Sequence, residues 1–203
     1  NHAMSVVATG GFSTHNESIA YFNSSLIEWI IILFMFWGGF PLMMGIYLFR
    51  NHFDLIRKND QIKLYCYLIL GVVFLLSFLR WMSVSFDNAQ LSSILRTTVF
   101  AVTAVTSTGF TLDNYQLWGS WAVVIFMFLM LPGGCTGSTT GGIKQFRVSV
   151  MMKIIHSKLK TTARPHGVFI PRYGDNPISE DVVFGVLTFI SLYLVCLLFG
   201  TLA

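Results

Sequence analysis

The sequence predicts an all-α membrane protein built from tandem units of one design, and three observations support this prediction. Of the 203 residues, 54% are hydrophobic and only 11% are charged, which is too apolar for an ordinary soluble domain. The apolar residues lie in long runs rather than in an alternating or heptad pattern. A short apolar–Thr–Gly segment also occurs twice, 98 residues apart, and a long hydrophobic stretch follows each copy.

The two copies of this segment cover residues 3–16 and 101–114. Five positions are identical and three more keep a small hydroxyl group. The identical pairs are Ala3/Ala101, Val7/Val105, Gly11/Gly109, Phe12/Phe110 and Asn16/Asn114, and the hydroxyl pairs are Ser5/Thr103, Thr9/Ser107 and Ser13/Thr111. A hydroxyl-rich turn that ends in Gly, between membrane segments, can direct backbone carbonyls into a pore. The repeat therefore favours an ion-conducting membrane protein.

Three apolar stretches are long enough to be membrane spans. At 1.5 Å per residue, residues 26–49 would extend roughly 36 Å as one helix, against a hydrocarbon core of about 30 Å. The other two spans are expected at 64–86 and 181–202. A further stretch, 120–131, is too short to cross alone and resumes at 143–155, so we expect it to be a broken second span.

Basic residues and tryptophans predict the orientation. The loops 50–63 and 144–172 are rich in Lys and Arg, and the second has no Asp or Glu, so the positive-inside rule places both in the cytoplasm. The basic residues of the first loop are Arg50, Arg57, Lys58 and Lys63. Trp29, Trp81, Trp118 and Trp121 then fall near the outer interface. Both repeated turns come to the outer side, and 94–105 is long enough for a re-entrant pore helix before the second turn.

The repeated turns are candidate cation sites. A dehydrated monovalent cation needs several oxygens of moderate field strength, which stacked carbonyls supply without a fixed negative charge. Gly permits the dihedral angles that aim successive carbonyls in one direction. An ordinary Gly-containing loop is the alternative, but two copies at the same place in the unit favour a selectivity filter. The expected filter residues are Ala8, Thr9, Gly10, Gly11, Thr106, Ser107, Thr108 and Gly109.

Segment 132–142 has five glycines in eleven residues and forms the break in the second span. So much Gly after a Pro should unwind a helix, and nearby hydroxyls can satisfy the freed amides. A flexible polar loop below a filter is suited to obstructing the pore, and a passive kink is the alternative. A phosphate-binding loop is excluded because Ile143 stands where Lys is needed and no strand precedes. The expected gating residues are Gly133, Gly134, Thr136, Gly137, Ser138, Thr139, Thr140, Gly141 and Gly142.

Two smaller features adjoin these elements. Lys144 and Arg147 directly follow the glycine-rich segment and are expected either to anchor in lipid or to contact a regulatory subunit. Residues 38–41, with the sequence Gly-Gly-Phe-Pro, mark a kink or a close helix approach within the first span.

Other classes of function are disfavoured. The 13 basic residues lie in loops rather than on one aromatic-flanked face, so nucleic-acid binding is not expected. The five histidines lack metal-ligand spacing, and no nucleophile elbow or close carboxylate pair occurs, so no enzyme activity is expected. The three cysteines, which are expected to be structural thiols without C-x-x-C spacing, are Cys66, Cys135 and Cys196.

Segments 2–16, 104–121 and 132–147 together resemble the Trk/Ktr/HKT superfamily of potassium transporters, most closely the bacterial TrkH-type uptake subunit. The resemblance implies four non-identical units around a pseudo-fourfold pore. Residues 1–50 would end the second unit, 64–155 would form the complete third, and 180–203 would start the fourth, with cytoplasmic loops at 51–63 and 156–179. Because the chain begins inside a repeat and stops inside an apolar run, we expect an internal stretch of a longer protein.

The resemblance also implies function and partners. It implies K+ uptake across the bacterial cytoplasmic (inner) membrane, with K+ at the filter residues as the transported ion and no cofactor bound by this chain. Gly11 and Gly109 are the family's potassium-type choice. A homodimer docked on a cytoplasmic nucleotide-binding ring of the TrkA type is expected. The alternatives are a broken-helix transporter of another small solute, which predicts inverted repeats, and a non-transporting scaffold, which gives no reason for a doubled turn.

Overall fold

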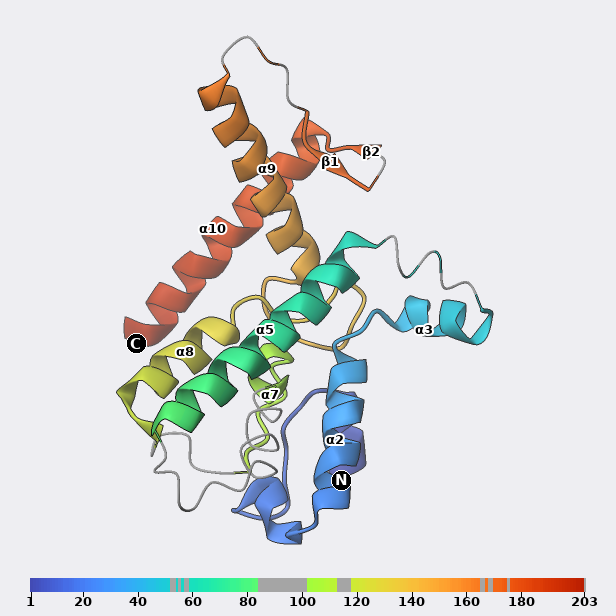
Figure 1. The fold of residues 1–203 in the computed structure, drawn as a ribbon, viewed down its shortest axis with the longest axis vertical. Helices are drawn as coiled ribbons and strands as arrows, with labels where there is room; N and C mark the ends of the chain where they lie inside the picture. Colours follow the sequence, from blue (N-terminus) through green and yellow to red (C-terminus); the bar gives the residue numbers. More distant parts are fainter. Residues whose placement is uncertain are drawn as a thin grey trace.

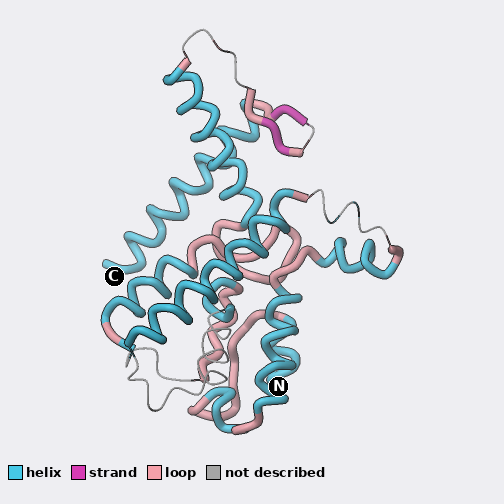
Figure 2. The backbone as a smooth tube through the Cα atoms, in the orientation of Figure 1, coloured by secondary structure: helices cyan, strands magenta, loops and turns pink. Residues whose placement is uncertain are grey.

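The structure, a computed structural model, describes residues 1–51, 54, 56, 59–83, 102–112, 118–164, 167, 170–174 and 176–202. These residues are mainly helical (Figures 1 and 2). The helices, in chain order, are α1 (His2–Val7), the 3-10 helix η1 (Ser18–Phe22), α2 (Ser25–Gly38), α3 (Leu42–Phe49), α5 (Asp60–Ser83), α7 (Val102–Val105), α8 (Ser120–Leu129), α9 (Gln145–Ala163) and α10 (Glu180–Leu202). A two-stranded antiparallel hairpin pairs β1 (Arg172–Tyr173) with β2 (Asn176–Pro177).

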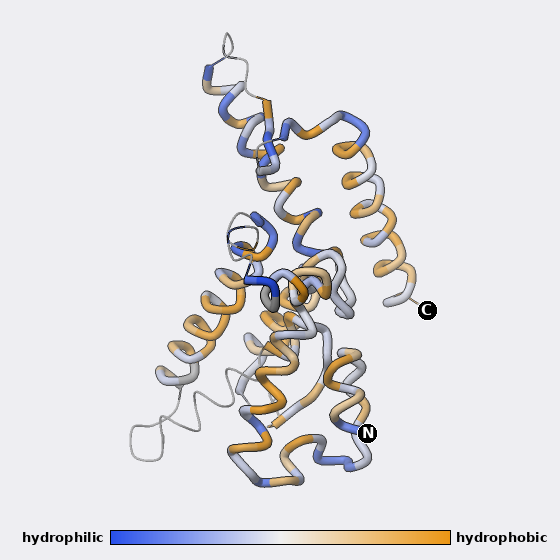
Figure 3. Tube along the Cα trace, turned by 90° about the vertical axis from the view of Figure 1, so that its right-hand side faces the viewer, coloured by the Kyte–Doolittle hydropathy of each residue, from blue (hydrophilic) through white to orange (hydrophobic). Residues whose placement is uncertain are grey.

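Within this described part of the chain, α5 over Asp60–Leu79 and α10 over Glu180–Leu202 are long and apolar enough to cross a membrane. Their side chains are largely uncovered, since Phe74 is 76% and Leu198 is 64% exposed. A core helix of a soluble protein would bury such residues, whereas a bilayer covers them. The apolar colouring follows α10 down to the C-terminal end (Figure 3). The two helices therefore have the surface of lipid-facing spans.

The segment 26–49 is not one continuous helix, and the kink or close helix approach expected at 38–41 is confirmed. The segment forms α2 and α3, which separate at Gly39–Pro41 and point in different directions (Figure 1). Pro41 has no backbone donor, and the groups beside it bond elsewhere. The carbonyl of Gly39 accepts from the amide of Cys135 at 2.9 Å, and the amide of Leu42 donates to the carbonyl of Gly137 at 3.0 Å. The glycine-rich segment thus takes the hydrogen bonds that a continuous helix would use.

Two hydrophobic clusters surround the repeated segments. One joins α5, α7 and α8, with Tyr65, Leu76 and Val105 fully buried in it. The other joins α1, η1 and α2, and it also buries Phe110 of the second repeat. Because a residue of the second copy completes the core around the first, the two repeats pack as one body.

Some predicted features lie outside the described residues. These are the basic residues Arg57 and Lys58, the first part of the expected re-entrant helix (94–101), and Asn114 at the end of the second repeat. The described end of that helix is α7, in which all four residues are buried. The turn that follows α7 is described through Leu112.

Candidate functional site

The two repeated turns have matching backbone conformations. Each follows a short helix, α1 in the first copy and α7 in the second. In the first turn, φ is 51° at Thr9 and 68° at Gly11, and in the second it is 55° at Ser107 and 88° at Gly109. A positive φ is uncommon for residues other than Gly, so its recurrence at Thr9 and Ser107 is a specific match.

The same hydrogen bonds close both turns. The amide of Phe12 donates to Ser5 Oγ at 2.7 Å, and the amide of Phe110 donates to Thr103 Oγ1 at 2.9 Å. The amide two residues before each Phe donates to the carbonyl of the same Ser or Thr, at 2.8 and 2.9 Å. Ser5 and Thr103 were not among the predicted site residues. The hydroxyl shared by the two copies at this position is the sequence signal that points to them.

The two turns lie side by side. A Cβ on Gly11 would collide with the carbonyl oxygen of Thr108 and would lie 3.3 Å from the Cα of Gly109. A Cβ on Gly109 would meet no described atom within 4 Å. The equivalent glycines therefore differ in setting, because Gly11 faces the second turn and Gly109 faces open space.

The threonine hydroxyls of the turns are engaged within them. Thr106 Oγ1 lies 2.9 Å from the carbonyl of Val102, to which it donates, and 2.8 Å from Thr108 Oγ1. Thr106 and Thr108 are almost completely buried. In the first turn, Thr9 Oγ1 donates to the carbonyl of Ala8 at 2.8 Å. These hydroxyls stabilise the turns through hydrogen bonds within them. The candidate cation ligands of the turns are therefore their backbone carbonyl oxygens.

The glycine-rich segment is a closed, non-helical loop between α8 and α9, covering residues 130–144. The amide of Ile143 donates to the carbonyl of Leu131 at 2.9 Å, so the two ends of the loop meet. Inside the loop, Thr140 Oγ1 accepts from the amide of Gly134 at 3.0 Å and lies 2.7 Å from Ser138 Oγ. The expected pairing of freed amides with hydroxyls is therefore seen at Gly134.

This loop touches both repeated turns. Thr139 Oγ1 lies 3.0 Å from the carbonyl of Val7 at the end of α1 and 3.2 Å from the carbonyl of Gly38, both within hydrogen-bonding distance. A Cβ on Gly141 would lie 3.8 Å from the Cβ of Ser107 in the second turn. In Figure 2 the non-helical segments meet in the middle of the molecule, between the helices. The predicted filter and gating residues thus come together in space.

Lys144 and Arg147 make contacts within the chain. Lys144 Nζ donates to the carbonyl of Thr140 and, at 3.3 Å, to that of Ser138, so its side chain turns back onto the loop. Arg147 Nη1 donates to the carbonyl of Ile143 at 3.2 Å, and its guanidinium carbon lies 3.8 Å from the ring centroid of Phe189 in α10. The contact with lipid or a regulatory subunit stays a prediction.

Two glutamines next to the loop were not predicted. Gln145, the first residue of α9, is fully buried and donates from Nε2 to the carbonyl of Gly133 at 2.8 Å. Gln61, in the first turn of α5, accepts from the amide of Thr136 at 3.1 Å. A single Gln at a helix start reads as an ordinary polar residue, so the sequence carries no signal for either contact.

The long apolar helices with exposed side chains, and the two matched turns packed between helices, are the features of a membrane-embedded protein. The chain belongs to the TrkH family, described as "Cation transport protein", which it matches over residues 1–203. The description of the family is that of transport proteins rather than enzymes.

The relatives that the chain resembles are bacterial. It is 35% identical to the Trk system potassium uptake protein TrkI of Halomonas elongata over 93% of this chain and 38% of that protein. It is 28% identical to the Trk system potassium uptake protein TrkH of Salmonella typhimurium, over 100% of this chain and 42% of that protein. The crystal structure of the potassium transporter TrkH from Vibrio parahaemolyticus superimposes with a TM-score of 0.89 at 25% identity, covering 96% of this chain and 42% of that one. The chain therefore spans about two fifths of the length of these relatives.

Proposed function

We propose that this chain is a section of a bacterial potassium uptake protein, in which K+ crosses the cytoplasmic membrane through a channel-like pore. The names of the relatives support the choice of ion. The single observation that carries the proposal is the pair of matched turns in contact at Gly11 and Thr108. Two such turns place two rows of carbonyls together, as a cation that has shed its water requires.

In this proposal the filter oxygens come from the carbonyls of residues 8–11 and 106–109. The bracing hydroxyls of Thr106 and Thr108 fix the second row from behind. Two further turns, from the remainder of the protein, complete a pseudo-fourfold ring. Gly109, with open space beside it, faces the axis, and the membrane potential drives K+ inward with about 2.3 kcal/mol per charge per 100 mV.

The glycine-rich loop is the gate in this proposal. Thr139 contacts Val7, directly before the first turn, and in this proposal the loop obstructs the path of the ion there. A loop without helical hydrogen bonds can move without unfolding a helix. Displacement of the loop opens the path. The path closes when the loop returns and Thr139 again contacts the Val7 carbonyl.

The proposed organisation follows the pore units. Residues 1–50 end the second unit, 64–155 form the third with its broken second span, and 180–203 begin the fourth. Segments 51–63 and 156–179 face the cytoplasm. The protein works as a homodimer with a cytoplasmic TrkA-type ring that binds the nucleotide, and Lys144 and Arg147 lie at the side of the loop that faces this ring.

Radioactive rubidium uptake by liposomes that contain the full-length protein tests the proposed function. We expect uptake that K+ blocks and Na+ does not, with a Gly109→Ser variant losing this preference. No uptake, with a membrane potential and cytoplasmic partners supplied, would contradict the proposal. An unchanged ion preference in an active Gly109→Ser protein would remove Gly109 from the filter.

A further inference from the structure

The glycine-rich loop is held from outside by two glutamines on different helices. Gln61 Oε1, on α5, accepts from the amide of Thr136, and Gln145 Nε2, on α9, donates to the carbonyl of Gly133. The backbone amide of Gln145 also donates to the carbonyl of Gly134 at 2.9 Å. Gln61 therefore serves the loop as an acceptor and Gln145 serves it as a donor.

Glutamine suits this task because the loop has lost its helical hydrogen bonds. The Gly133 carbonyl bonded by Gln145 is buried and needs a partner, whereas the bond from Thr136 to Gln61 is exposed. A Gln side chain offers both a donor and an acceptor without a charge. Gln61 and Gln145 therefore bind the loop through one neutral acceptor and one neutral donor, beside the ammonium group of Lys144.

The Gln145 side chain is specialised as a donor. It is fully buried, and among the described atoms its Oε1 has no hydrogen-bond partner. A buried acceptor without a donor is unfavourable, and among the described residues no group holds this side chain through its oxygen. The bond from Nε2 to Gly133 is the side-chain contact that orients it.

The helices that carry the two glutamines are tied to each other. Asp60, next to Gln61, forms an ion pair with Lys153 of α9 and accepts from the amide of Gly174 in the hairpin at 3.2 Å. Because this ion pair joins α5 to α9, Gln61 and Gln145 contact the loop from two helices that are linked to each other. Neither can shift far without moving the other helix.

We propose that Gln61 and Gln145 are the positioning residues of the glycine-rich loop and hold it against the repeated turns. The inference rests on the proposed function of the loop as the gate. Removing either side-chain contact releases the loop toward the open position. A purely structural role would lower the amount of folded protein, whereas release of a gate raises ion flux per folded molecule.

Opposite hydrogen-bond roles give an internal test. Gln61→Met and Gln145→Met remove both functions of the amide at similar size. Gln61→Glu keeps an acceptor for Thr136, at a helix start where negative charge is favourable. Gln145→Glu loses the donor and sets a carboxylate oxygen against the Gly133 carbonyl. Tyr67→Met, at an exposed position of α5, is the matched control.

The first measurement is rubidium flux per folded full-length protein in liposomes without cytoplasmic partners. We expect severalfold higher flux for Gln61→Met, Gln145→Met and Gln145→Glu, with the K+ preference unchanged, and wild-type flux for Gln61→Glu and Tyr67→Met. Unchanged or lower flux per folded molecule in both Met variants overturns the inference. So does an equal response to Glu at the two positions.

A second readout does not depend on transport. Cys135 lies in the loop and is fully buried. In a protein where all other cysteines are replaced by Ser, a water-soluble maleimide should label Cys135 several times faster in the Met variants than in the parent. Equal labelling rates overturn the inference even if the parent carries no rubidium. If labelling responds but no variant transports, the proposed function fails and the positioning role stands.

Discussion

The carbonyl oxygen of Thr108 occupies the space that a side chain on Gly11 would need. The equivalent glycine of the second repeat, Gly109, has no described neighbour within 4 Å of its Cβ position. Both have a positive φ, which already disfavours other residues. At Gly11 both the positive φ and the Thr108 carbonyl disfavour a side chain. At Gly109 only the positive φ does so among the described residues.

This asymmetry predicts different results for the same substitution at the two glycines. Gly11→Ser must push the second turn away, which adds an overpacking cost of roughly 1–3 kcal/mol to the strain of the positive φ. Gly109→Ser carries only the strain. We expect a clearly lower melting temperature in detergent for Gly11→Ser, and a stable protein with reduced K+ preference for Gly109→Ser. Equal melting temperatures would show that the two turns do not pack as described.

The hydroxyl of Thr103 provides a second prediction. Thr103→Val keeps the shape but leaves the buried amide of Phe110 without its acceptor, at a cost of about 1–3 kcal/mol. We expect lower thermal stability together with weaker discrimination between K+ and Na+, because the second turn loses its closing bond. Thr103→Ser keeps the hydroxyl and should behave like the parent. A Val variant with normal stability and selectivity would mean that this bond does not shape the turn.

The sequence predicts the repeated turns and the glycine-rich loop because each is encoded locally. Glycines indicate an unusual backbone conformation within a few residues, as at Gly11, Gly109 and the glycines of 132–142. The break between α2 and α3 is different, because Gly39 bonds to Cys135, which is far away in the chain. The Gly-Gly-Phe-Pro sequence at 38–41 indicates a kink, but it cannot show that a distant loop takes the hydrogen bonds of the interrupted helix.

The same limit explains the residues that the sequence did not reveal. Ser5 and Thr103 could be found by asking why a hydroxyl recurs between copies. Gln61 and Gln145 have no counterpart in a repeat, and their value comes from the atoms that folding places next to them. For Lys144 the structure adds a contact between its side chain and the carbonyls of the loop, and the expected contact with lipid or a regulatory subunit stays a prediction.

Thr139 allows a third prediction, on the contact between the loop and the first turn. Thr139→Val removes the hydroxyl that lies between the carbonyls of Val7 and Gly38. Because the loop then loses a tie to the first turn, we expect faster rubidium uptake at low membrane potential with unchanged K+ preference. Thr136→Val is the control, since Thr136 contacts Gln61 through its backbone. Identical uptake by the two variants would argue against a gating contact at Thr139.

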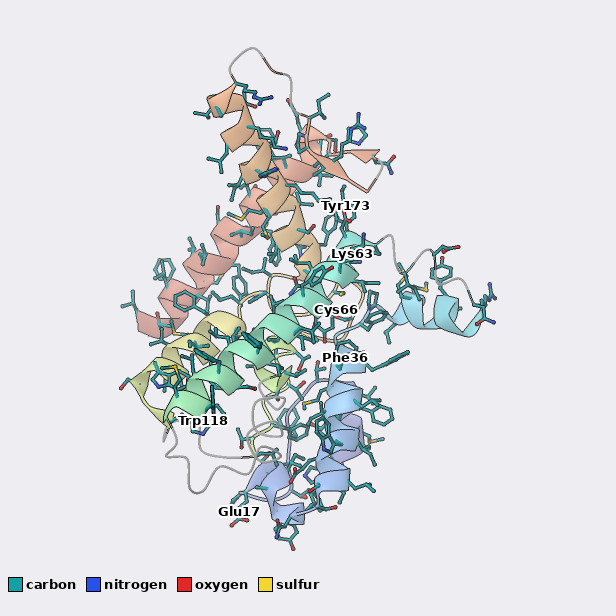
Figure 4. The ribbon with its side chains drawn as sticks, viewed as in Figure 1. Glu17, Phe36, Lys63, Cys66, Trp118 and Tyr173 are labelled. Carbon is teal, nitrogen blue, oxygen red and sulfur yellow. The ribbon has the colours of Figure 1, made fainter. Side chains whose placement is uncertain are left out.

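The last prediction concerns pH and the junction of α5, α9 and the hairpin, where Tyr173 lies beside the start of α5 near Lys63 (Figure 4). Tyr173 packs edge-on against Phe146 with ring centroids 5.1 Å apart, and its hydroxyl lies 3.4 Å from Asn59 Oδ1, to which it donates. Desolvation raises the pKa of Tyr173 above its ordinary value. The folded state therefore favours the neutral phenol.

A raised pKa makes the contribution of Tyr173 to stability complete below the ordinary tyrosine pKa of about 10, and this contribution is lost as the pH rises above that value. Tyr173→Phe keeps the ring but cannot ionise. We expect the melting-temperature difference between the parent and Tyr173→Phe to be constant from about pH 7 to 9 and to move in favour of Phe above about pH 10. A constant difference through pH 11 would show that the phenol is not desolvated at this junction, because a solvated phenol ionises equally in the folded and unfolded states.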